Sequence, residues 1–318
     1  MIGIVSHDED LHAAEVRRHL ASMGASVALF DTAKVPVGVP LTTRQDPVAG
    51  WSGAWGRDGP DLREVRVMWW RRPQPFVLSD DLAARDDRVF AVGECQAAVS
   101  GLWACLDATW VNDPDRDTAA SRKMWQLKLA QELGLRVPRT CITSDPDVAR
   151  AFIASEPGRV IFKPFGGTPE TWRETRPIRP VDLPLLDHVR FAPVIFQQAI
   201  EGGCDIRVTI AGDTLFAASI QARSEDTAFD FRIDPQAPMQ PHELPVPVRT
   251  RLLALMARLG LRYGAVDLRL DPGGEHVFLE INPAGQWLFV EYGTGQPISA
   301  AVAALLAGLD RPATREAR

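Results

Sequence analysis

Two alternating strands joined by a Pro-Gly-Gly turn constrain this chain more than any other segment does. The segment Tyr263–Gly285 reads YGAVDLRLDPGGEHVFLEINPAG. Alternation places one set of apolar side chains on a single face of the predicted hairpin: Val266, Leu268, Leu270, Val277, Leu279 and Ile281. A four-residue loop at 272–275 would pair Asp267 directly with Glu280 on the other face. The sequence therefore predicts an antiparallel hairpin with one apolar and one acidic face.

The acidic face of this hairpin would carry Asp267, Glu280 and Asn282. Two carboxylates and an amide are hard oxygen ligands that suit magnesium, which also binds the phosphates of a nucleotide. The spacing therefore favours a magnesium site that takes a nucleotide. An ordinary amphipathic hairpin with a solvated acidic face accounts for the same spacing, so both interpretations stay open at this point.

Length and composition indicate two or three domains with substantial cores. The chain has 318 residues, of which 46% are hydrophobic and 24% charged, as in soluble globular proteins. Its net charge is −6 and it has no long basic run, so we expect no nucleic-acid partner. No apolar stretch approaches the roughly 18 residues that span a bilayer, and the N-terminus lacks the basic region of a signal peptide. We therefore expect a cytoplasmic protein with no membrane partner. The four cysteines follow no metal or disulfide spacing, and we expect them to be reduced and buried: Cys95, Cys105, Cys141 and Cys204.

The secondary-structure pattern divides the chain into three parts and a tail. Residues 1–110 begin as strand, helix and strand, which predicts a parallel βαβ opening. Residues 111–190 mix helices and strands, and residues 191–310 predict antiparallel strands, a helix, the acidic hairpin and a final helix. An Arg-rich tail follows at 311–318. The pattern predicts an α/β fold with α+β character. The expected elements include strands at 2–5 and 26–30 and helices at 10–23, 84–102, 146–155, 247–259 and 298–309.

Two lysines are candidates for binding phosphate. Lys123 begins a helix, and Lys163 ends a strand just before Gly166 and Gly167. A lysine on a strand beside a glycine turn can hold nucleotide phosphates while the turn closes over them as a lid. The motifs GxxxxGK[ST] and GxGxxG are both absent, which excludes a P-loop and disfavours dinucleotide binding. Each lysine taken alone is more commonly a solvated surface charge.

Other residues are candidates for binding a substrate. Arg71 and Arg72 follow a strand's C-terminal end, where open α/β sheets bind ligands. They can hold a substrate carboxylate in a bidentate manner or form an ion pair between domains. Trp287 follows the acidic hairpin directly, and we place it near the substrate. His7 and His12 follow no metal-binding spacing, and we expect both to be exposed loop residues.

The order of these motifs resembles the ATP-grasp superfamily over nearly the whole chain. The shared pieces are Lys123, FKP at 162–164, FQQAIEGGCDIR at 196–207, DFR at 230–232, Asp267, Glu280 and Asn282. Within that superfamily the chain is most similar to RimK-like ligases, and especially to the graspetide (microviridin-type) peptide macrocyclases. The sequences WWRRP, LAQELGLRVPRT, DIRVTIAGD and NPAGQW point to that branch. The resemblance implies an ATP-grasp fold with an N-terminal pre-ATP-grasp βαβ domain, a central lid domain and a C-terminal domain of mixed and antiparallel strands.

The resemblance also implies roles for individual residues. ATP would be bound by Lys123 and Lys163 at its phosphates, by the hinge residues Gln198, Ala199 and Ile200 at its adenine, and by Asp205 near its ribose. Magnesium, as two ions or with manganese in its place, would be bound by Asp267, Glu280 and Asn282. Arg232 and Arg223 would be catalytic residues near the acyl phosphate, and Arg207 would bind substrate together with Arg71, Arg72 and Trp287. Two positions depart from the family pattern, because Arg122 stands where many relatives have Asn or Asp and Gln198 replaces Glu.

The implied reaction begins when ATP converts a substrate carboxylate into an acyl phosphate, which a hydroxyl or an amine then attacks. We expect the substrate to be a ribosomal precursor peptide, leader plus core, whose Asp or Glu side chains are joined to Thr, Ser or Lys. Segment 168–190 would contact the leader or would be an ordinary surface loop. We also expect a homodimer. Two alternatives stay open: a RimK-like ligase that adds an amino acid to a small molecule or a protein tail, and a non-catalytic nucleotide-binding regulator.

Overall fold

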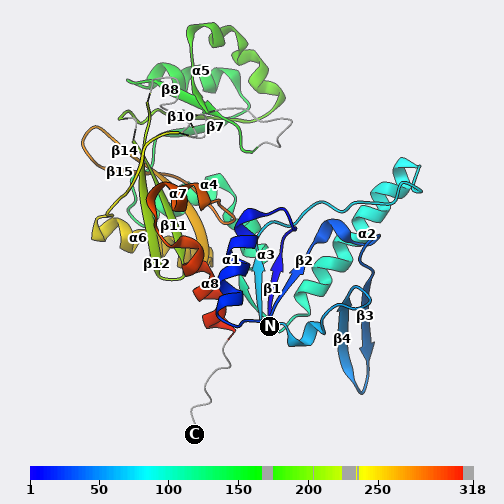
Figure 1. The fold of residues 1–318 in the computed structure, drawn as a ribbon. Coiled ribbons are helices and arrows are strands. Elements are labelled where there is room, and N and C mark those ends of the chain that lie inside the picture. Colours follow the sequence, from blue (N-terminus) through cyan, green and yellow to red (C-terminus); the bar gives the residue numbers. More distant parts are fainter. Residues whose placement is uncertain (167–174, 203, 224–233, 235, 311–318) are drawn as a thin grey trace.

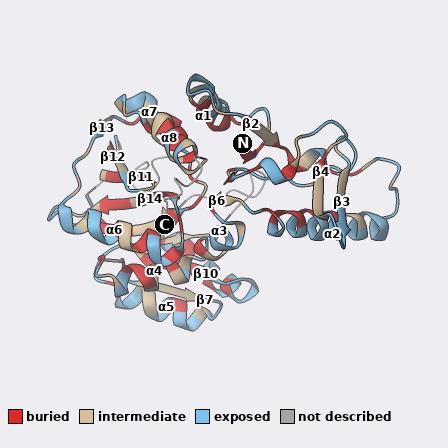
Figure 2. Ribbon diagram, turned by 90° about the horizontal axis from the view of Figure 1, so that it is seen from below, coloured by how far each residue is buried: buried red, intermediate tan, exposed pale blue. Residues whose placement is uncertain are grey.

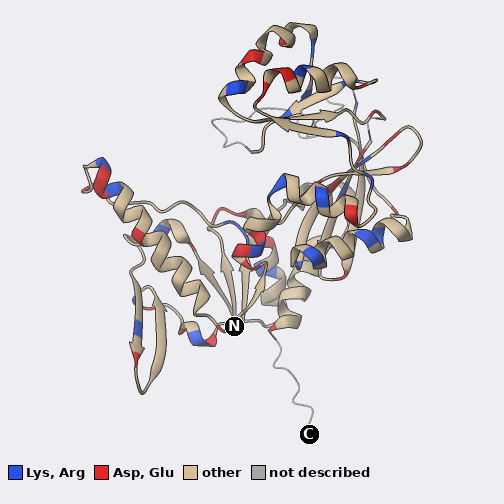
Figure 3. Ribbon diagram, turned by 180° about the vertical axis from the view of Figure 1, so that it is seen from behind, with Lys and Arg blue, Asp and Glu red and all other residues tan. Residues whose placement is uncertain are grey.

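The computed structural model describes residues 1–166, 175–202, 204–223, 234 and 236–310. Three units are visible in Figure 1, each built on a sheet of its own, and the central unit lies farthest from the N-terminal one. Charges of both signs are spread over all three units (Figure 3). None of the described helices is long and apolar enough to cross a membrane.

Four parallel strands form the N-terminal sheet, in the order β2-β1-β5-β6. They span Ile2–Val5 (β1), Val27–Phe30 (β2), Val67–Trp70 (β5) and Thr109–Val111 (β6). Helix α1 (Leu11–Ser22) packs on one face, against Ile2 and Ile4, and helix α2 (Arg85–Ala104) packs on the other, against Val5. A parallel sheet is normally covered on both faces in this way. The expected βαβ opening is confirmed, and a separate hairpin, β3 (Leu41–Asp46) and β4 (Gly50–Trp55), extends beside it.

The central unit is a small antiparallel sheet with helices on one side. Its strand order is β7-β10-β8-β9, with bounds Thr140–Thr143 (β7), Val160–Lys163 (β8), Arg176–Pro177 (β9) and Val194–Gln198 (β10). Helix α5 (Pro146–Ser155) and the 3-10 segment η4 (Pro180–Phe191) contribute Ala149, Leu186 and Val189 to its core. Strand β10, which the sequence pattern assigned to the C-terminal part, therefore belongs to the central sheet.

The C-terminal unit is a five-stranded sheet in the order β13-β12-β11-β14-β15. Its strands are β11 (Cys204–Ala211), β12 (Thr214–Gln221), β13 (Met239–Pro241), β14 (Tyr263–Leu270) and β15 (His276–Asn282). Helices α4 (Lys123–Glu132) and α6 (Val246–Leu259) pack against one face, where Val266, Leu268 and Phe278 are buried. Helix α3 (Pro114–Ala120) precedes α4, so residues assigned to the central part pack on the C-terminal sheet instead.

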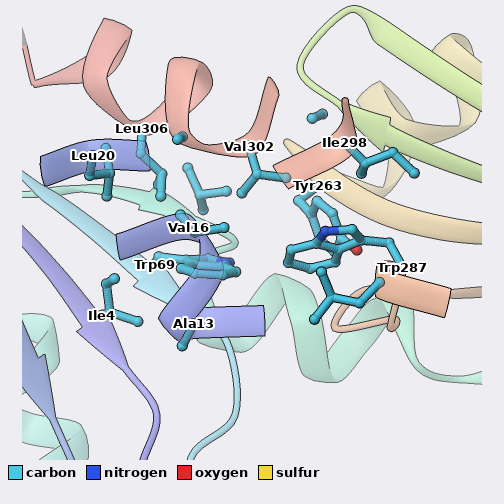
Figure 4. Packing of buried hydrophobic residues seen from close by; sticks show 14 of the residues in the cluster. Ile4, Ala13, Val16, Leu20, Trp69, Tyr263, Trp287, Ile298, Val302 and Leu306 are labelled. Atoms are coloured by element: carbon cyan, nitrogen blue, oxygen red, sulfur yellow. The ribbon is translucent and has the colours of Figure 1, made fainter. Parts of the chain in front are cut away.

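A second core joins the C-terminal unit to the N-terminal sheet. Helices α7 (Leu288–Thr294) and α8 (Ile298–Leu309) follow β15, and Val302 and Leu306 of α8 pack beside Trp69 and α1. Figure 4 shows Trp287 and Tyr263 next to this contact. The N-terminal half of α2, by contrast, is mostly exposed (Figure 2). The cysteines are all free: Cys95 is buried as expected, but Cys105 is exposed and Cys141 and Cys204 are partly buried.

Candidate active site

A cavity of about 670 Å³ lies where the three units meet. It is lined from the N-terminal unit by the two residues that follow β5, from the central unit by β8 and β10, and from the C-terminal unit by β11, β14 and β15. Most residues singled out from the sequence line it: Arg71, Arg72, Lys163, Gln198, Ile200, Asp205, Arg207, Asp267, Glu280 and Asn282. Segments far apart in the sequence thus converge on one concave site.

The hairpin of β14 and β15 brings the two carboxylates together as expected, but by a different route. Asp267 pairs with Glu280 in the ladder. The loop has five residues rather than four, because Leu270 pairs with His276, and an irregularity of register between Asp267 and Leu268 restores the expected pairing. Leu279, which was predicted on the apolar face, consequently lines the cavity. Phe278 lies on the apolar face in its place.

Each of the two carboxylates has a cationic partner. Arg207 Nη1 donates to Asp267 Oδ1 at 2.8 Å, and Lys123 forms an ion pair with Glu280. The Asn282 side-chain oxygen accepts from the Ala284 N–H at 3.0 Å. Within the described ranges no group of three or more His, Cys, Asp or Glu residues is placed to bind a metal. Two carboxylates and one amide on a cavity wall nevertheless form a donor set that fits magnesium when phosphate oxygens supply further ligands.

Gln126 of α4 is a site residue that sequence reasoning missed. Its Nε2 donates to the carbonyl oxygens of Ala120 (2.6 Å) and Ile281 (2.8 Å), and its Oε1 accepts from the Ile281 N–H at 3.1 Å. Ile281 lies between Glu280 and Asn282 on the outermost strand, so the amide fixes the backbone that carries both. The signal was available, because a glutamine at a buried position of an amphipathic helix requires a buried hydrogen-bond partner.

The hinge at 198–200 joins the central and C-terminal units. The N–H groups of Gln198 and Ala199 donate to backbone carbonyls at 2.8 Å, whereas no described residue accepts from the Ile200 N–H. The Ile200 carbonyl accepts from Arg269 Nε at 2.6 Å, and Arg269 Nη1 donates to Asp205 at 2.9 Å. Arg269, which the sequence did not indicate, thus links the hinge to Asp205 inside a buried ion pair. Ala199 is buried and does not line the cavity.

The two adjacent arginines of the N-terminal unit differ in role. Arg71 is only 1% exposed, and it donates to Asp10 Oδ2 at 3.2 Å and to the carbonyl oxygen of Ala284 at 2.6 Å. Its ion pair lies within the N-terminal unit, and its link to the C-terminal unit is a hydrogen bond to a backbone carbonyl rather than the interdomain ion pair considered from the sequence. Arg72 is exposed at the cavity wall and is the better candidate for contact with a substrate carboxylate.

Two expectations for aromatic residues are wrong. Trp287 does not line the cavity: it is fully buried, packs against Trp69 and Tyr263, and donates from Nε1 to Ser299 at 2.8 Å. His12 is not exposed but buried, with its ring 4.6 Å from that of Trp287. Both errors arise because α1 packs against the C-terminal unit, a contact that local sequence cannot reveal. His7 is partly buried.

The candidate catalytic arginines fall at the edge of the described structure or outside it. Arg223 donates from Nε and Nη2 to Asp234, at 2.6 and 2.7 Å, and Asp234 lines the cavity while Arg223 does not. Arg232, Gly167, residues 168–174 of the candidate leader segment and the tail at 311–318 lie outside the described residues.

Similar solved structures extend over nearly the whole chain. The macrocyclase MdnB from Microcystis aeruginosa MRC is 30% identical, with 96% of this chain and 98% of MdnB covered and a TM-score of 0.81. A RiPP-associated ATP-grasp ligase from Chryseobacterium gregarium, in complex with ADP and a leader and core peptide, is 26% identical, with 98% and 97% covered and a TM-score of 0.89. The chain belongs to the RiPP-associated ATP-grasp ligases.

This ATP-grasp ligase is also similar to macrocyclase MdnC from Microcystis aeruginosa MRC, bound with its precursor peptide MdnA, at 28% identity, a TM-score of 0.86, and 96% and 99% coverage of the two chains. Neither a family model nor a curated protein sequence matches the chain. The ATP-grasp fold expected from the sequence is confirmed.

Proposed function

We propose that this ATP-grasp ligase closes rings in a ribosomal precursor peptide by joining Asp or Glu side chains to the hydroxyl or amino groups of Thr, Ser or Lys. The observation that carries the proposal is the likeness, over almost the entire chain, to two macrocyclases and to a ligase bound to leader and core peptide. The open cavity between the three units supports a peptide substrate, because residues of all three can reach it.

We propose that ATP binds between the central and C-terminal units. Lys163 and Lys123 would bind its phosphates, and the Ile200 N–H would bind adenine, since the N–H groups of Gln198 and Ala199 are already engaged. Gln197, beside the hinge, supports this placement: it is 1% exposed, lines the cavity and has a side-chain oxygen with no partner among the described residues. Asp205 would face the ribose.

Asp267, Glu280 and Asn282 would hold magnesium, and the number of ions stays open. Bound magnesium would neutralise phosphate charge during phosphoryl transfer. The protein's own part is to redistribute its ion pairs: Lys123 and Arg207, which neutralise the two carboxylates in this structure, would turn toward the phosphates or the substrate. Such an exchange keeps both partly buried carboxylates neutralised in both states.

The chemistry would proceed in two steps. The γ-phosphoryl group of ATP moves to a substrate carboxylate, which gives ADP and an acyl phosphate. A hydroxyl or amine then attacks the acyl carbon, and inorganic phosphate leaves. Arg72 and Arg207 would bind the carboxylate, and Arg232, assigned by family resemblance, would stabilise the oxyanion. Exclusion of water matters because an acyl phosphate hydrolyses, and we assign that task to the lid that begins at Gly166.

The test is an intact-mass assay with the precursor peptide encoded beside the gene, ATP and magnesium. Each ring closed removes one water from the peptide mass. Glu280→Gln should abolish that loss, whereas the matched variant Glu275→Gln, exposed in the loop of the same hairpin, should retain it. An unchanged peptide, with ADP released only when free amino acids are added, would instead support the RimK-like alternative.

Partners and assembly complete the proposal. The leader would contact the central unit, whose segment η4 exposes Val181, Leu185 and Phe191. We also propose a cytoplasmic homodimer, which the exposed apolar side chains Val89 and Phe90 of α2 support. Light scattering on the purified protein, with and without precursor peptide, measures the assembly directly.

A further inference from the structure

The loop between β15 and α7 has its backbone carbonyls fixed at consecutive residues. Ala284 accepts from Arg71 Nη1 at 2.6 Å, Gly285 from the Tyr263 hydroxyl at 2.7 Å, and Gln286 from Arg207 Nη2 at 2.8 Å. Arg71 directly follows β5, Tyr263 begins β14, and Arg207 lies in β11. The loop that follows β15 is therefore held by residues of both the N-terminal and the C-terminal unit.

His12 holds the far end of the same loop. Its Nε2 accepts from the N–H groups of Trp287 and Leu288, at 3.1 and 3.3 Å. These groups begin helix α7, where backbone N–H groups have no partner within the helix, and the Trp287 side chain makes no capping hydrogen bond. Acceptance at Nε2 requires a neutral imidazole that carries its proton on Nδ1. The Nδ1 atom lies 3.5 Å from Asp10 Oδ1.

Asp10 connects His12 to Arg71. Its Oδ2 accepts from Ser6 Oγ at 2.8 Å and from Arg71 Nε at 3.2 Å, and its side chain is only 1% exposed. Burial raises the pKa of Asp10, but hydrogen bonds from His12 and Ser6 and the charge of Arg71 hold that pKa well below its usual range. A permanently ionised Asp10 thus orients both the imidazole and the guanidinium.

We propose that Asp10, His12 and Arg71, here called the N-terminal cluster, are positioning residues for the ligase reaction. By fixing residues 284–288 they set the Gln286 carbonyl, which holds Nη2 of Arg207; the other terminal nitrogen, Nη1, pairs with Asp267 in this structure. This inference rests on the proposed function insofar as Asp267 holds magnesium. Protonation of His12 turns its acceptor into a donor, so the cluster releases the loop in acid.

The charged groups that act on His12 are few. Asp10 favours its protonated form, and Arg71 and Arg72 oppose it. The groups that reach it from the loop, the Trp287 ring and two backbone N–H groups, are uncharged. Burial is the largest influence and lowers the pKa of His12 below its ordinary value. Release of the loop is therefore expected only below about pH 6.5.

Hydrogen exchange of the Trp287 and Leu288 amides tests the cluster without any enzymatic assay. The variants are His12→Leu, which removes the acceptor, and His12→Gln, which offers an uncharged oxygen near the same place. His19→Gln, on the same helix α1 and without contact to the loop, is the matched control. After correction for intrinsic exchange rates, protection at pH 7.5 should fall about tenfold in His12→Leu and stay near wild type in the other two. A stepwise pH decrease from 7.5 should reduce protection in wild type, with a midpoint below about 6.5, but not in His12→Gln.

Turnover then separates a positioning role from a structural one. His12→Leu should lower kcat for ring closure about tenfold with little change in KM for ATP, and His12→Gln should restore kcat and remove the acid limb of the pH profile. Equal amide protection in His12→Leu and wild type would overturn the proposal, as would lost protection with unchanged kcat. If wild-type enzyme closes no ring, the proposed function fails, while the exchange experiment still decides whether the cluster holds the loop.

Discussion

The side-chain amide of Gln126 pairs with both backbone groups of Ile281, at 2.8 and 3.1 Å. At Ile281 it takes the place of a neighbouring strand on the outer side of β15, where the described residues form only an isolated bridge, between Arg136 and Val277. Lys123, one turn earlier on α4, forms the ion pair with Glu280. One helix therefore fixes the edge of the candidate magnesium site and supplies a cation to it.

Replacing Gln126 should loosen the metal site. Gln126→Leu keeps most of the volume but leaves the N–H and C=O of Ile281 buried and unpaired, which should lower the free energy of unfolding by about 2 kcal/mol. We expect affinity for manganese, measured by electron paramagnetic resonance with a non-hydrolysable ATP analogue, to fall about tenfold. Lys128→Ala, on the exposed side of α4, is the control. Unchanged manganese affinity in Gln126→Leu would show that the amide serves stability alone.

Substitutions of Arg71 and Arg72 should have different effects, the first on stability and the second on substrate binding. Arg71→Met leaves the buried Asp10 carboxylate without its partner, which should lower the free energy of unfolding by about 3–5 kcal/mol. Arg72→Met should change that free energy by less than about 0.5 kcal/mol but raise KM for the precursor peptide. Urea denaturation and steady-state kinetics measure the two effects. Equal destabilisation by both substitutions would contradict the division of roles.

Asp117 should make stability fall with rising pH. Its Oδ2 is buried without a partner among the described residues, and burial raises its pKa to about 6. In the unfolded chain the pKa is about 3.9, so the folded state binds the extra proton between about pH 4 and 6. The cost in folding free energy of burying the ionised carboxylate is absent below about pH 4, grows as the pH rises from about 4 to 6, and is constant above about pH 6.

Asp117→Asn should remove this penalty. The variant should be more stable than wild type by on the order of 2 kcal/mol at pH 7.5 and nearly equal to it at pH 4. Urea denaturation at several pH values measures the difference, with Asp115→Asn on the same helix α3 as control. A pH-independent difference between Asp117→Asn and wild type would rule out burial of the ionised carboxylate as its cause.

Gly285 should tolerate no side chain. A Cβ there would overlap the Cβ of Ala265 and lie 2.9 Å from Arg207 Nη2. Gly285→Ala should therefore displace Arg207, destabilise the fold by about 1–3 kcal/mol and reduce ring closure. Gly308→Ala in α8, where a Cβ meets no atom within 4 Å, should stabilise the protein by about 0.5–1 kcal/mol. Thermal unfolding ranks the two variants, and a stable, active Gly285→Ala enzyme would contradict the tight packing.

The pairing of Asp267 with Glu280 was predictable because a hairpin is local: alternation and a short turn determine which residues share a face. Even there the loop length was wrong. The Asp271 carboxylate accepts from the N–H groups of Gly273 and Glu275, at 2.8 and 2.9 Å, and so closes a five-residue loop. An aspartate that precedes Pro-Gly is a known signal for such a turn, and it was available in the sequence.

The errors at His12 and Trp287 have a different origin. Trp287 contacts His12 of α1 and Trp69 of β5, which precede it by more than 200 residues. An aromatic residue after a candidate metal-binding hairpin is equally consistent with a substrate contact and with an interdomain core. Only the packing of α1 and α8 decides between them, and no local pattern encodes that packing.

The irregular register between Asp267 and Leu268 has a consequence for how such hairpins vary among related chains. The loop carries one residue more than regular pairing of Asp267 with Glu280 would need, and the extra residue on β15 compensates for it before the carboxylates are reached. A change of one residue in loop length is therefore offset by a β-bulge, and Asp267 stays opposite Glu280. A one-residue gap at 271–275 between two such sequences is therefore compatible with the same pairing of the two carboxylates.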